Sequence, residues 1–439
     1  MVAVMYDYIE SLPLVDSLAY LPPREEARPR RDIVAEFLAD APADALLAAG
    51  FDAEMFAMAR NEKLSVREKW DVIAPYWTKA QYTSGCKAIM LAICELYGFD
   101  TIERENIEAL DMSFRSTFNS DRYNYILKER CGIEFSVLLP PETDNICRNG
   151  GDAGMLSADR RYFITVNDIC GLVAPRSREE VFAVGRQADV TASSFDDYLE
   201  ACARVLKRFA QENGIIICGG GTAPVQSSSA LDTAYKKENY IKNRLPSPRK
   251  TSYSDARGAY DNFMYGSRSS EPVAMYRYVY RFLLGLAAEK NMTFRLDEDA
   301  RNCTLADDPD CFRELCALFP ELKFDVLVSA YHRRCGIGYM AGIYPNVYAN
   351  LSRAECALPE YLEFVPYNKI IAFGSGCRTI DAVYGRAVLV REGIARILQD
   401  KIAAGGMKSY DAKTIASALT SGNAHELYGR TEMRVDVGG

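Results

Sequence analysis

Short apolar runs alternate along this chain with longer amphipathic stretches. The short runs have the composition of strands in a parallel sheet, whereas the longer stretches have the periodicity of helices. The pattern predicts eight strands, at residues 12–18, 133–139, 161–167, 214–219, 292–297, 324–330, 346–352 and 369–375. Eight strands with intervening helices predict a (β/α)8 barrel, although periodicity alone leaves a doubly wound sheet as an alternative.

Two long segments interrupt this alternation. Residues 24–130 carry amphipathic helical patterns, and residues 220–272 are polar and rich in turn-forming residues. In a barrel these segments follow the first and fourth strands, so both would lie over the carboxyl-terminal mouth, where loops carry catalytic residues. We therefore predict an α/β fold with one TIM-barrel domain, residues 1–439, a helical insertion after strand 1 and a loop-rich insertion after strand 4.

Charge and hydropathy limit the classes of partner. The 439-residue chain has a net charge of −8, which argues against general nucleic-acid binding. No apolar run reaches transmembrane length, and the N-terminus carries Asp7 and Glu10 rather than an apolar leader. Thirteen cysteines without any CxxC pair favour reduced thiols, so we expect a cytoplasmic protein that contacts no membrane.

Histidine is scarce, with only His332 and His425 in the whole chain. Imidazole is the commonest ligand of catalytic zinc, and a typical site uses about two or three. The composition alone therefore limits metal chemistry.

Several segments together resemble the amidohydrolase superfamily, in particular its Amidohydrolase-2 branch with the uronate isomerases. VDSLAYLPP (15–23) is similar to the branch's IDTHxHLPP opening, YPNVYANLS to its seventh strand and KIIAFGSG to its eighth. EKWDVIAPYWTKAQYTSGCKAIMLAICELYG resembles the family's helical insert, and AKTIASALTSGNAHELYG its terminal helix. The resemblance runs from about residue 9 to 429, matches poorly over 140–290, and implies a TIM barrel and a homo-oligomer.

The resemblance also implies where a divalent metal, usually zinc, would bind. The family takes two histidines from strand 1, one each from strands 5 and 6, and an aspartate from strand 8. The residues at those positions here are Leu18, Tyr20, Asp297, Ser329 and Gly376. Leucine and glycine offer no ligand atom, and neutral tyrosine and serine oxygens are poor ligands. We therefore expect no cofactor and no family-type metal site.

Other side chains near the expected mouth are candidates for chemistry. Asp297 is a candidate general acid or base in place of metal-bound water, with His332 as a proton carrier and Arg333 and Arg334 as anion-binding groups. The alternative is that Asp297 belongs to a solvated acidic loop and that residues 332–334 form a basic surface loop.

Five further residues are candidate substrate-binding groups. Tyr20 and Ser329 would point at the former metal position, or else fill its volume. Cys377 follows the last strand, where a thiolate can be a nucleophile, but most cysteines are small buried hydrophobes. Trp77 and Lys79 lie in the helical insert that resembles a substrate-contacting segment, or they pack its aromatic face.

Two functions remain open. The first is a metal-independent hydrolase, lyase or isomerase that acts on a small polar substrate, carboxylate-bearing or sugar-like. The second is a non-catalytic binding or scaffolding protein that retains the barrel. Because function depends on the site and not on the fold, the sequence alone does not decide between them.

Overall fold

The strands of the fold are parallel throughout. The computed structural model describes residues 2–119, 121–139, 158–218, 250–266, 272–297, 309–328, 334–352 and 354–429. Its strands pair in the orders β1-β2-β3 and β4-β5-β6-β7-β8-β9. Their bounds are β1 (Leu14–Ala19), β2 (Ile133–Leu138), β3 (Phe163–Thr165), β4 (Asn167–Asp168), β5 (Ile215–Ile217), β6 (Thr293–Asp297), β7 (Lys323–Leu327), β8 (Val347–Asn350) and β9 (Ile370–Ile371).

Backbone hydrogen bonds join these two sheets into one closed barrel. β3 and β4 form a single bent strand, because the Val166 N–H between them donates to the carbonyl of Leu138 at 3.1 Å. At the other edge, Ser17 N–H donates to Phe373 O at 3.1 Å and Gly376 N–H donates to Leu18 O at 2.7 Å. The predicted eight strands and the (β/α)8 barrel are therefore confirmed, and the doubly wound alternative is wrong.

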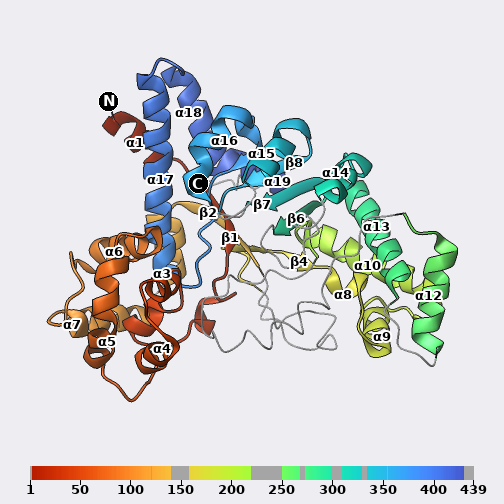
Figure 1. The fold of residues 1–439 in the computed structure, drawn as a ribbon, viewed down its shortest axis with the longest axis horizontal. Helices are drawn as coiled ribbons and strands as arrows, with labels where there is room; N and C mark the ends of the chain where they lie inside the picture. The colour runs from red at the N-terminus through yellow and green to blue at the C-terminus, as the bar shows by residue number, and fades with distance from the viewer. Residues whose placement is uncertain are drawn as a thin grey trace, which may run out of the picture.

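Amphipathic helices surround the barrel (Figure 1). Local caps explain where several of them begin: Ser194 forms a capping box with Asp197 at α10, and Pro309 is the first residue of α14. The helices between strands include α9 (Arg178–Gln187), α10 (Phe195–Glu212), α13 (Val273–Glu289), α14 (Pro309–Leu318), α15 (Arg334–Ile343), α16 (Leu358–Phe364) and α17 (Ile380–Ala403). None of the helices in the described ranges is long and apolar enough to cross a membrane.

The segment between β1 and β2 forms a helical lobe on one side of the barrel, at the lower left of Figure 1. It comprises α2 (Ile33–Phe37), α3 (Pro42–Ala48), α4 (Ala53–Ala59), α5 (Val66–Ala80), α6 (Ser84–Tyr97) and α7 (Ile107–Ser116), followed by the π-helical segment η3 (Asn124–Arg130). Most of the polar segment 220–272 lies outside the described residues, and its described part is largely α12 (Tyr253–Tyr265).

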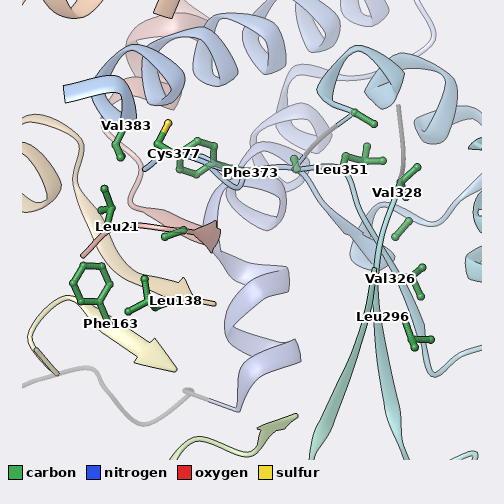
Figure 2. Packing of buried hydrophobic residues seen from close by; sticks show 14 of the residues in the cluster. Leu21, Leu138, Phe163, Leu296, Val326, Val328, Leu351, Phe373, Cys377 and Val383 are labelled. Carbon is green, nitrogen blue, oxygen red and sulfur yellow. The ribbon is translucent and has the colours of Figure 1, made fainter. Parts of the chain in front are cut away.

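Alternation along the strands separates two hydrophobic layers. On β7, Phe324 and Val326 face the outer helices, and Phe324 contacts Phe312 of α14 with ring centroids 5.6 Å apart. Leu327 instead belongs to the cluster inside the barrel, together with Leu18. Figure 2 shows part of the outer layer, including Leu296, Val326, Val328, Leu351 and Phe373.

The last described elements of the chain pack against the barrel. After α17, the helix α18 (Ser409–Ser417), the π-helical turn η7 (Ala418–Gly422) and the helix α19 (Asn423–Tyr428) run back to the barrel. Leu427 and Tyr428 of α19 are buried in the cluster that fills the interior. The C-terminal helix therefore closes one end of the barrel.

The helical lobe is joined to the barrel where α6 packs on α17, at Gly385. A Cβ atom at Gly385 would lie 1.8 Å from the Ala88 carbonyl oxygen, so only glycine allows this backbone approach. A Cβ atom at Gly393, on the same helix, would have open space around it, with no atom within 4 Å.

We expect Gly385→Ala to destabilise the protein by about 3 kcal/mol, since overpacking against backbone cannot relax by side-chain rotation. Urea unfolding followed by circular dichroism measures this change. Gly393→Ala is the matched control, and we expect it to stabilise slightly, by about 0.5–1 kcal/mol. Equal effects from the two substitutions would contradict the close packing of α6 on α17.

Candidate functional site

Asp16 fastens the first strand to the end of the last strand. Its Oδ1 accepts hydrogen bonds from the backbone N–H of Ser375 at 2.7 Å and of Leu18 at 3.1 Å. Its Oδ2 accepts a hydrogen bond from the Ser375 hydroxyl at 2.7 Å. Burial raises the pKa of Asp16 to about 6, even though these hydrogen bonds lower it.

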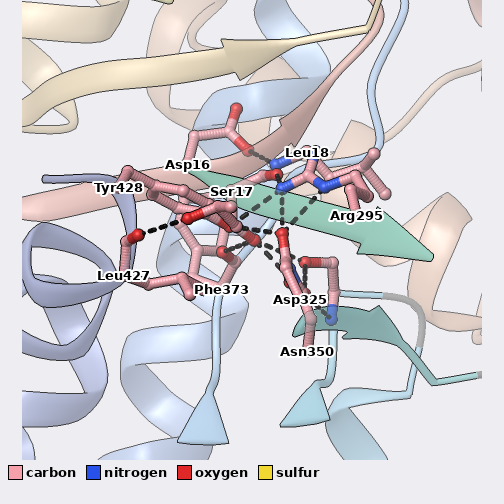
Figure 3. A network of polar contacts seen from close by, with 11 residues as sticks. Asp16, Ser17, Leu18, Arg295, Asp325, Asn350, Phe373, Leu427 and Tyr428 are labelled. Atoms are coloured by element: carbon pink, nitrogen blue, oxygen red, sulfur yellow. Dashed lines mark hydrogen bonds and ion pairs between the residues drawn. The ribbon is translucent and has the colours of Figure 1, made fainter. Parts of the chain in front are cut away.

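An ion pair between neighbouring strands occupies the barrel interior (Figure 3). Arg295 of β6 and Asp325 of β7 are both fully buried, and Arg295 Nη2 lies 2.6 Å from Asp325 Oδ2. Burial alone would lower the pKa of Arg295, but Asp325 and Tyr428 raise it above its usual value, so the guanidinium is charged. Sequence reasoning did not identify this pair. A signal was available, because Arg295 in MTFRLD and Asp325 in FDVLV are charged residues within predicted strands.

Residues of three further elements form hydrogen bonds with the pair. Arg295 Nη2 donates to the Ser17 carbonyl of β1 at 2.7 Å and to the Tyr428 hydroxyl of α19 at 2.8 Å. Asp325 Oδ1 accepts a hydrogen bond from Asn350 Nδ2 of β8 at 2.9 Å, as Figure 3 shows. Among the described residues, Arg295 Nη1 has no hydrogen-bond partner.

Hydroxyl groups extend this network toward β9 and the terminal helix. The Ser17 hydroxyl lies 2.7 Å from that of Ser352 and donates to Phe373 O, also at 2.7 Å. On the other side, the Thr293 hydroxyl donates to the Leu427 carbonyl at 2.6 Å. The network therefore fixes β1, β6, β7, β8 and α19 relative to one another below the mouth.

Apolar groups fill the place where the strand-1 ligand was expected. Leu18 has 0% of its surface exposed and packs within the interior cluster. A Cβ atom at Gly374 would lie 2.8 Å from the Leu18 Cβ atom, so the last strand approaches Leu18 closely. Cys377 is also buried, and burial raises the pKa of its thiol well above the usual value, which keeps it neutral.

An arginine covers Tyr20 at the mouth. Tyr20 is half-buried, and the guanidinium carbon of Arg378 lies 5.4 Å from its ring centroid. The guanidinium of Arg378 makes no ion pair with any described carboxylate. Burial and Asp40 raise the pKa of Asp44, and Arg378 is near enough to oppose that rise. Sequence reasoning missed Arg378, although its position directly after Cys377 at the end of the last strand was a signal.

Asp40 anchors the segment that carries Arg378. Its Oδ2 accepts hydrogen bonds from the backbone N–H of Arg378 at 3.0 Å, and from the backbone N–H and hydroxyl of Thr379 at 3.1 and 2.9 Å. Arg378 therefore projects from a backbone fixed at the N-terminus of α17.

The candidate residues of the insertion, Trp77 and Lys79, have their ring contacts within the helical lobe. Trp77 is buried against Phe37 and Trp70, with ring centroids 5.9 and 5.8 Å apart. The Lys79 ammonium lies 5.2 Å from the Tyr76 ring centroid on the same helix, α5. Both positions belong to the packing of the helical lobe.

The remaining candidates fall mostly outside the described residues. Ser329, His332 and Arg333 lie there entirely, as do the side chains of Asp297 and Arg334. Asp297 is the last residue of β6, and Arg334 the first of α15. Among the described residues, no group of three or more His, Cys, Asp and Glu side chains is placed to hold a metal ion.

His425 lies away from the mouth region, in α19. Its Nε2 is 2.6 Å from Glu134 Oε2 of β2, and this contact lowers the pKa of Glu134. The second histidine of the chain therefore helps to attach the terminal helix.

No protein-family model matches the chain. The fluG protein of Emericella nidulans is 26% identical over 133 residues, which are 28% of this chain but only 15% of that protein. The chain thus matches far less than two thirds of that relative's length.

The solved structures match almost the whole chain. Glucuronate isomerase from Caulobacter crescentus has a TM-score of 0.70 and 14% identity, covering 99% of this chain and 95% of that one. Uronate isomerase from Thermotoga maritima has a TM-score of 0.66 and 13% identity, covering 97% of both chains. The chain therefore has the barrel fold of these uronate isomerases, and identities this low establish the fold alone.

We expect Asp16→Asn to remove a pH dependence of stability. Because folding raises the pKa of Asp16 from 3.8 to about 6, the folded state binds more protons over this interval, and the native protein loses stability as the pH rises through it. The loss amounts to roughly 3 kcal/mol by about pH 7. Asparagine can keep the backbone hydrogen bonds, so the variant should show a flatter profile in urea unfolding from about pH 4 to 7. Parallel profiles for the two proteins would contradict the raised pKa.

We expect Asp325→Asn to destabilise the protein by about 3–5 kcal/mol, because it leaves the buried Arg295 charge uncompensated. Tyr428→Phe removes one hydroxyl from the same network and should cost about 1–2 kcal/mol. Urea unfolding of the two variants side by side measures the difference. A Tyr428→Phe loss as large as that of Asp325→Asn would show that the charge pair is not the dominant interaction.

Proposed function

We propose that this chain binds a small carboxylate-bearing, sugar-like ligand at the carboxyl-terminal mouth of the barrel, and acts on it without the family's metal as a hydrolase, lyase or isomerase. The observation that carries the proposal is the Arg378 guanidinium, which is stacked on Tyr20 and forms no ion pair with a described carboxylate. Arginine at such a position recognises carboxylates through two parallel hydrogen bonds.

The geometry around Arg378 suits a ligand that arrives from solvent. The guanidinium carbon lies over the Tyr20 ring, and a cation–π contact of this kind uses none of the guanidinium N–H donors in a hydrogen bond to a carboxylate. The backbone of Arg378 is fixed by Asp40, so little ordering is needed when a ligand binds. The side chain itself is half-buried, which strengthens a charge-assisted hydrogen bond relative to one in water.

The residues at the family's metal-ligand positions support activity without a metal. At two of the five family positions, Leu18 is a fully buried hydrocarbon and Gly376 has no side chain. These two residues do not fit a divalent cation, which needs oxygen, nitrogen or sulfur ligands. We therefore derive no catalytic step through a metal.

The proton-transfer groups in this proposal come from sequence reasoning. Asp297 would act as general acid or base and His332 as proton carrier, with Arg333 and Arg334 as further anion-binding groups. Arg378 would hold the carboxylate, and the Tyr20 hydroxyl would orient a neighbouring polar group of the ligand.

A second candidate function is ligand binding without catalysis. It is favoured because the described side chains nearest Leu18 lack a ready nucleophile or base: Cys377 is buried as a neutral thiol, and both oxygens of Asp16 are engaged by Ser375 or Leu18. On this interpretation the barrel would be a sensor or scaffold for the same small acid.

We expect D-glucuronate to bind to the purified chain in isothermal titration calorimetry, and Arg378→Gln to weaken that binding by about 10-fold or more. Arg396→Gln is the matched control, because Arg396 is an exposed arginine of the same helix, α17, and should leave the affinity unchanged. Equal affinities for native protein and Arg378→Gln would reject the proposed carboxylate site.

Turnover and metal content separate the remaining alternatives. Proton NMR of the same mixture in chelated buffer reports conversion of the sugar acid: conversion supports the enzyme, and binding without conversion supports the sensor or scaffold. Stoichiometric zinc in the purified protein, together with loss of binding on its removal, would contradict metal independence.

A further inference from the structure

A cavity of about 460 Å³ lies where the loop after β1, the end of the helical lobe and the segment before β3 meet. This volume is in the range of small-molecule sites. None of Leu18, Tyr20, Cys377 and Arg378 lines it, so it is separate from the proposed mouth site. Its lining is almost entirely charged, and consists of Glu25, Glu26, Arg28, Arg30, Phe118, Asp121, Asp159 and Arg161.

Arg28 is the most buried cation of this lining. Its side chain is only 7% exposed, and its guanidinium carbon lies 5.2 Å from the Phe118 ring centroid. Within the described part of the chain, its Nη2 is buried without a hydrogen-bond partner. A buried guanidinium with unused donors is costly, and an anion beside it would relieve that cost.

The nearest carboxylate among the described residues, that of Glu25, does not form a hydrogen bond with Arg28. Glu25 Oε1 is 3.8 Å from Arg28 Nη1, which is too long for a hydrogen bond. Glu25 instead accepts hydrogen bonds from the backbone N–H of Arg122 at 2.6 Å and of Tyr123 at 3.1 Å, at the start of η3. The Glu25 carboxylate therefore mainly caps the N-terminus of η3.

Arg161 and Asp159 form a two-point ion pair with each other in the lining. Arg161 donates to both oxygens of Asp159, with Nη2 to Oδ2 at 2.7 Å and Nε to Oδ1 at 3.1 Å. With this pair neutral, the groups left to meet a ligand are the buried Arg28, the exposed Arg30, and the exposed carboxylates of Glu26 and Asp121.

We propose that this cavity is a second ligand site, which takes a small molecule carrying a carboxylate together with hydroxyl or ammonium groups. The carboxylate pairs with Arg28, and the donor groups of the ligand face Glu26 and Asp121. A simple anion is disfavoured because the two exposed carboxylates would repel it. A hydroxy acid and an amino acid share the required chemistry.

A ligand bound in this cavity would change the electrostatic field at the junction between the helical lobe and the barrel. Burial raises the pKa values of Tyr97, Tyr123 and Glu36, and the charge of Arg28 opposes this rise at each of them. Tyr97 and Arg122 both bind Asp381 of α17. A ligand that neutralises Arg28 therefore changes the field on the groups that hold the lobe to the barrel.

The test is calorimetric titration of the full chain with sodium D-gluconate, L-serine and sodium acetate, repeated in the Arg378→Gln variant to remove the mouth site. We expect gluconate or serine to bind more tightly than acetate in both proteins, and Arg28→Gln to weaken that binding by about 10-fold or more. Arg60→Gln is the matched control, because Arg60 also stacks on a phenylalanine, Phe56 at 5.5 Å, but lines no part of this cavity.

The exposed carboxylates provide a test that does not depend on the folding of Arg28→Gln. Glu26→Gln with Asp121→Asn should weaken serine more than gluconate if the ligand is an amino acid, and weaken gluconate comparably if it is a hydroxy acid. The same double substitution should strengthen acetate binding, because it removes the two charges that repel a simple anion. No binding of any probe at about 10 mM, or equal affinities for native protein and both sets of variants, would overturn the proposal. Because Arg378→Gln tests the mouth and Arg28→Gln this cavity, failure of one proposal is distinguishable from failure of the other.

Discussion

The buried ion pair between Arg295 and Asp325 is the interaction on which the interior of this barrel depends. Removing two charges from water is expensive, and the cost is offset only when the pair is close and its remaining hydrogen-bonding capacity is used. Ser17, Asn350 and Tyr428 supply most of those partners from three other elements, and among the described residues only Arg295 Nη1 of the pair is left without one. Because the buried charges need hydrogen-bond partners from other elements, they fix the relative positions of the strands and of the terminal helix.

The mouth of the barrel, above this network, is lined by other kinds of side chain. Leu18 continues the apolar interior up to the last strand, while Arg378 and Tyr20 place a cation and an aromatic ring at the rim. A charge inside the barrel is neutralised by its neighbours, whereas the charge at the rim is not matched by any described ion-pair partner. This contrast is the physical reason for assigning ligand binding to the rim and a structural role to the interior.

Strand positions could be predicted from the sequence because burial on both faces leaves continuous apolar runs, as in GIIICG and FDVLVSA. The side-chain partners could not, because they depend on register across strands distant in sequence: Arg295 meets Asp325 only through the pairing of β6 with β7. Trp77 illustrates another limit: an aromatic helix face has the same sequence pattern whether it packs within the lobe or contacts a ligand, so its contact with Trp70 leaves the predicted ligand role a prediction. Arg378 was missed because a single arginine after a strand has no periodicity to mark it.

The join between the first and last strands has a consequence for the order of events during synthesis. Asp16 and Ser375 are 359 residues apart, yet their hydrogen bonds close the barrel. At typical elongation rates of about 5–20 residues per second, β1 waits roughly 20–70 s before its partner leaves the ribosome. Until then, one edge of β1 has unpaired backbone groups that are open to pairing with other chains. The nascent chain therefore passes through a long interval in which chaperone protection of this edge would matter most.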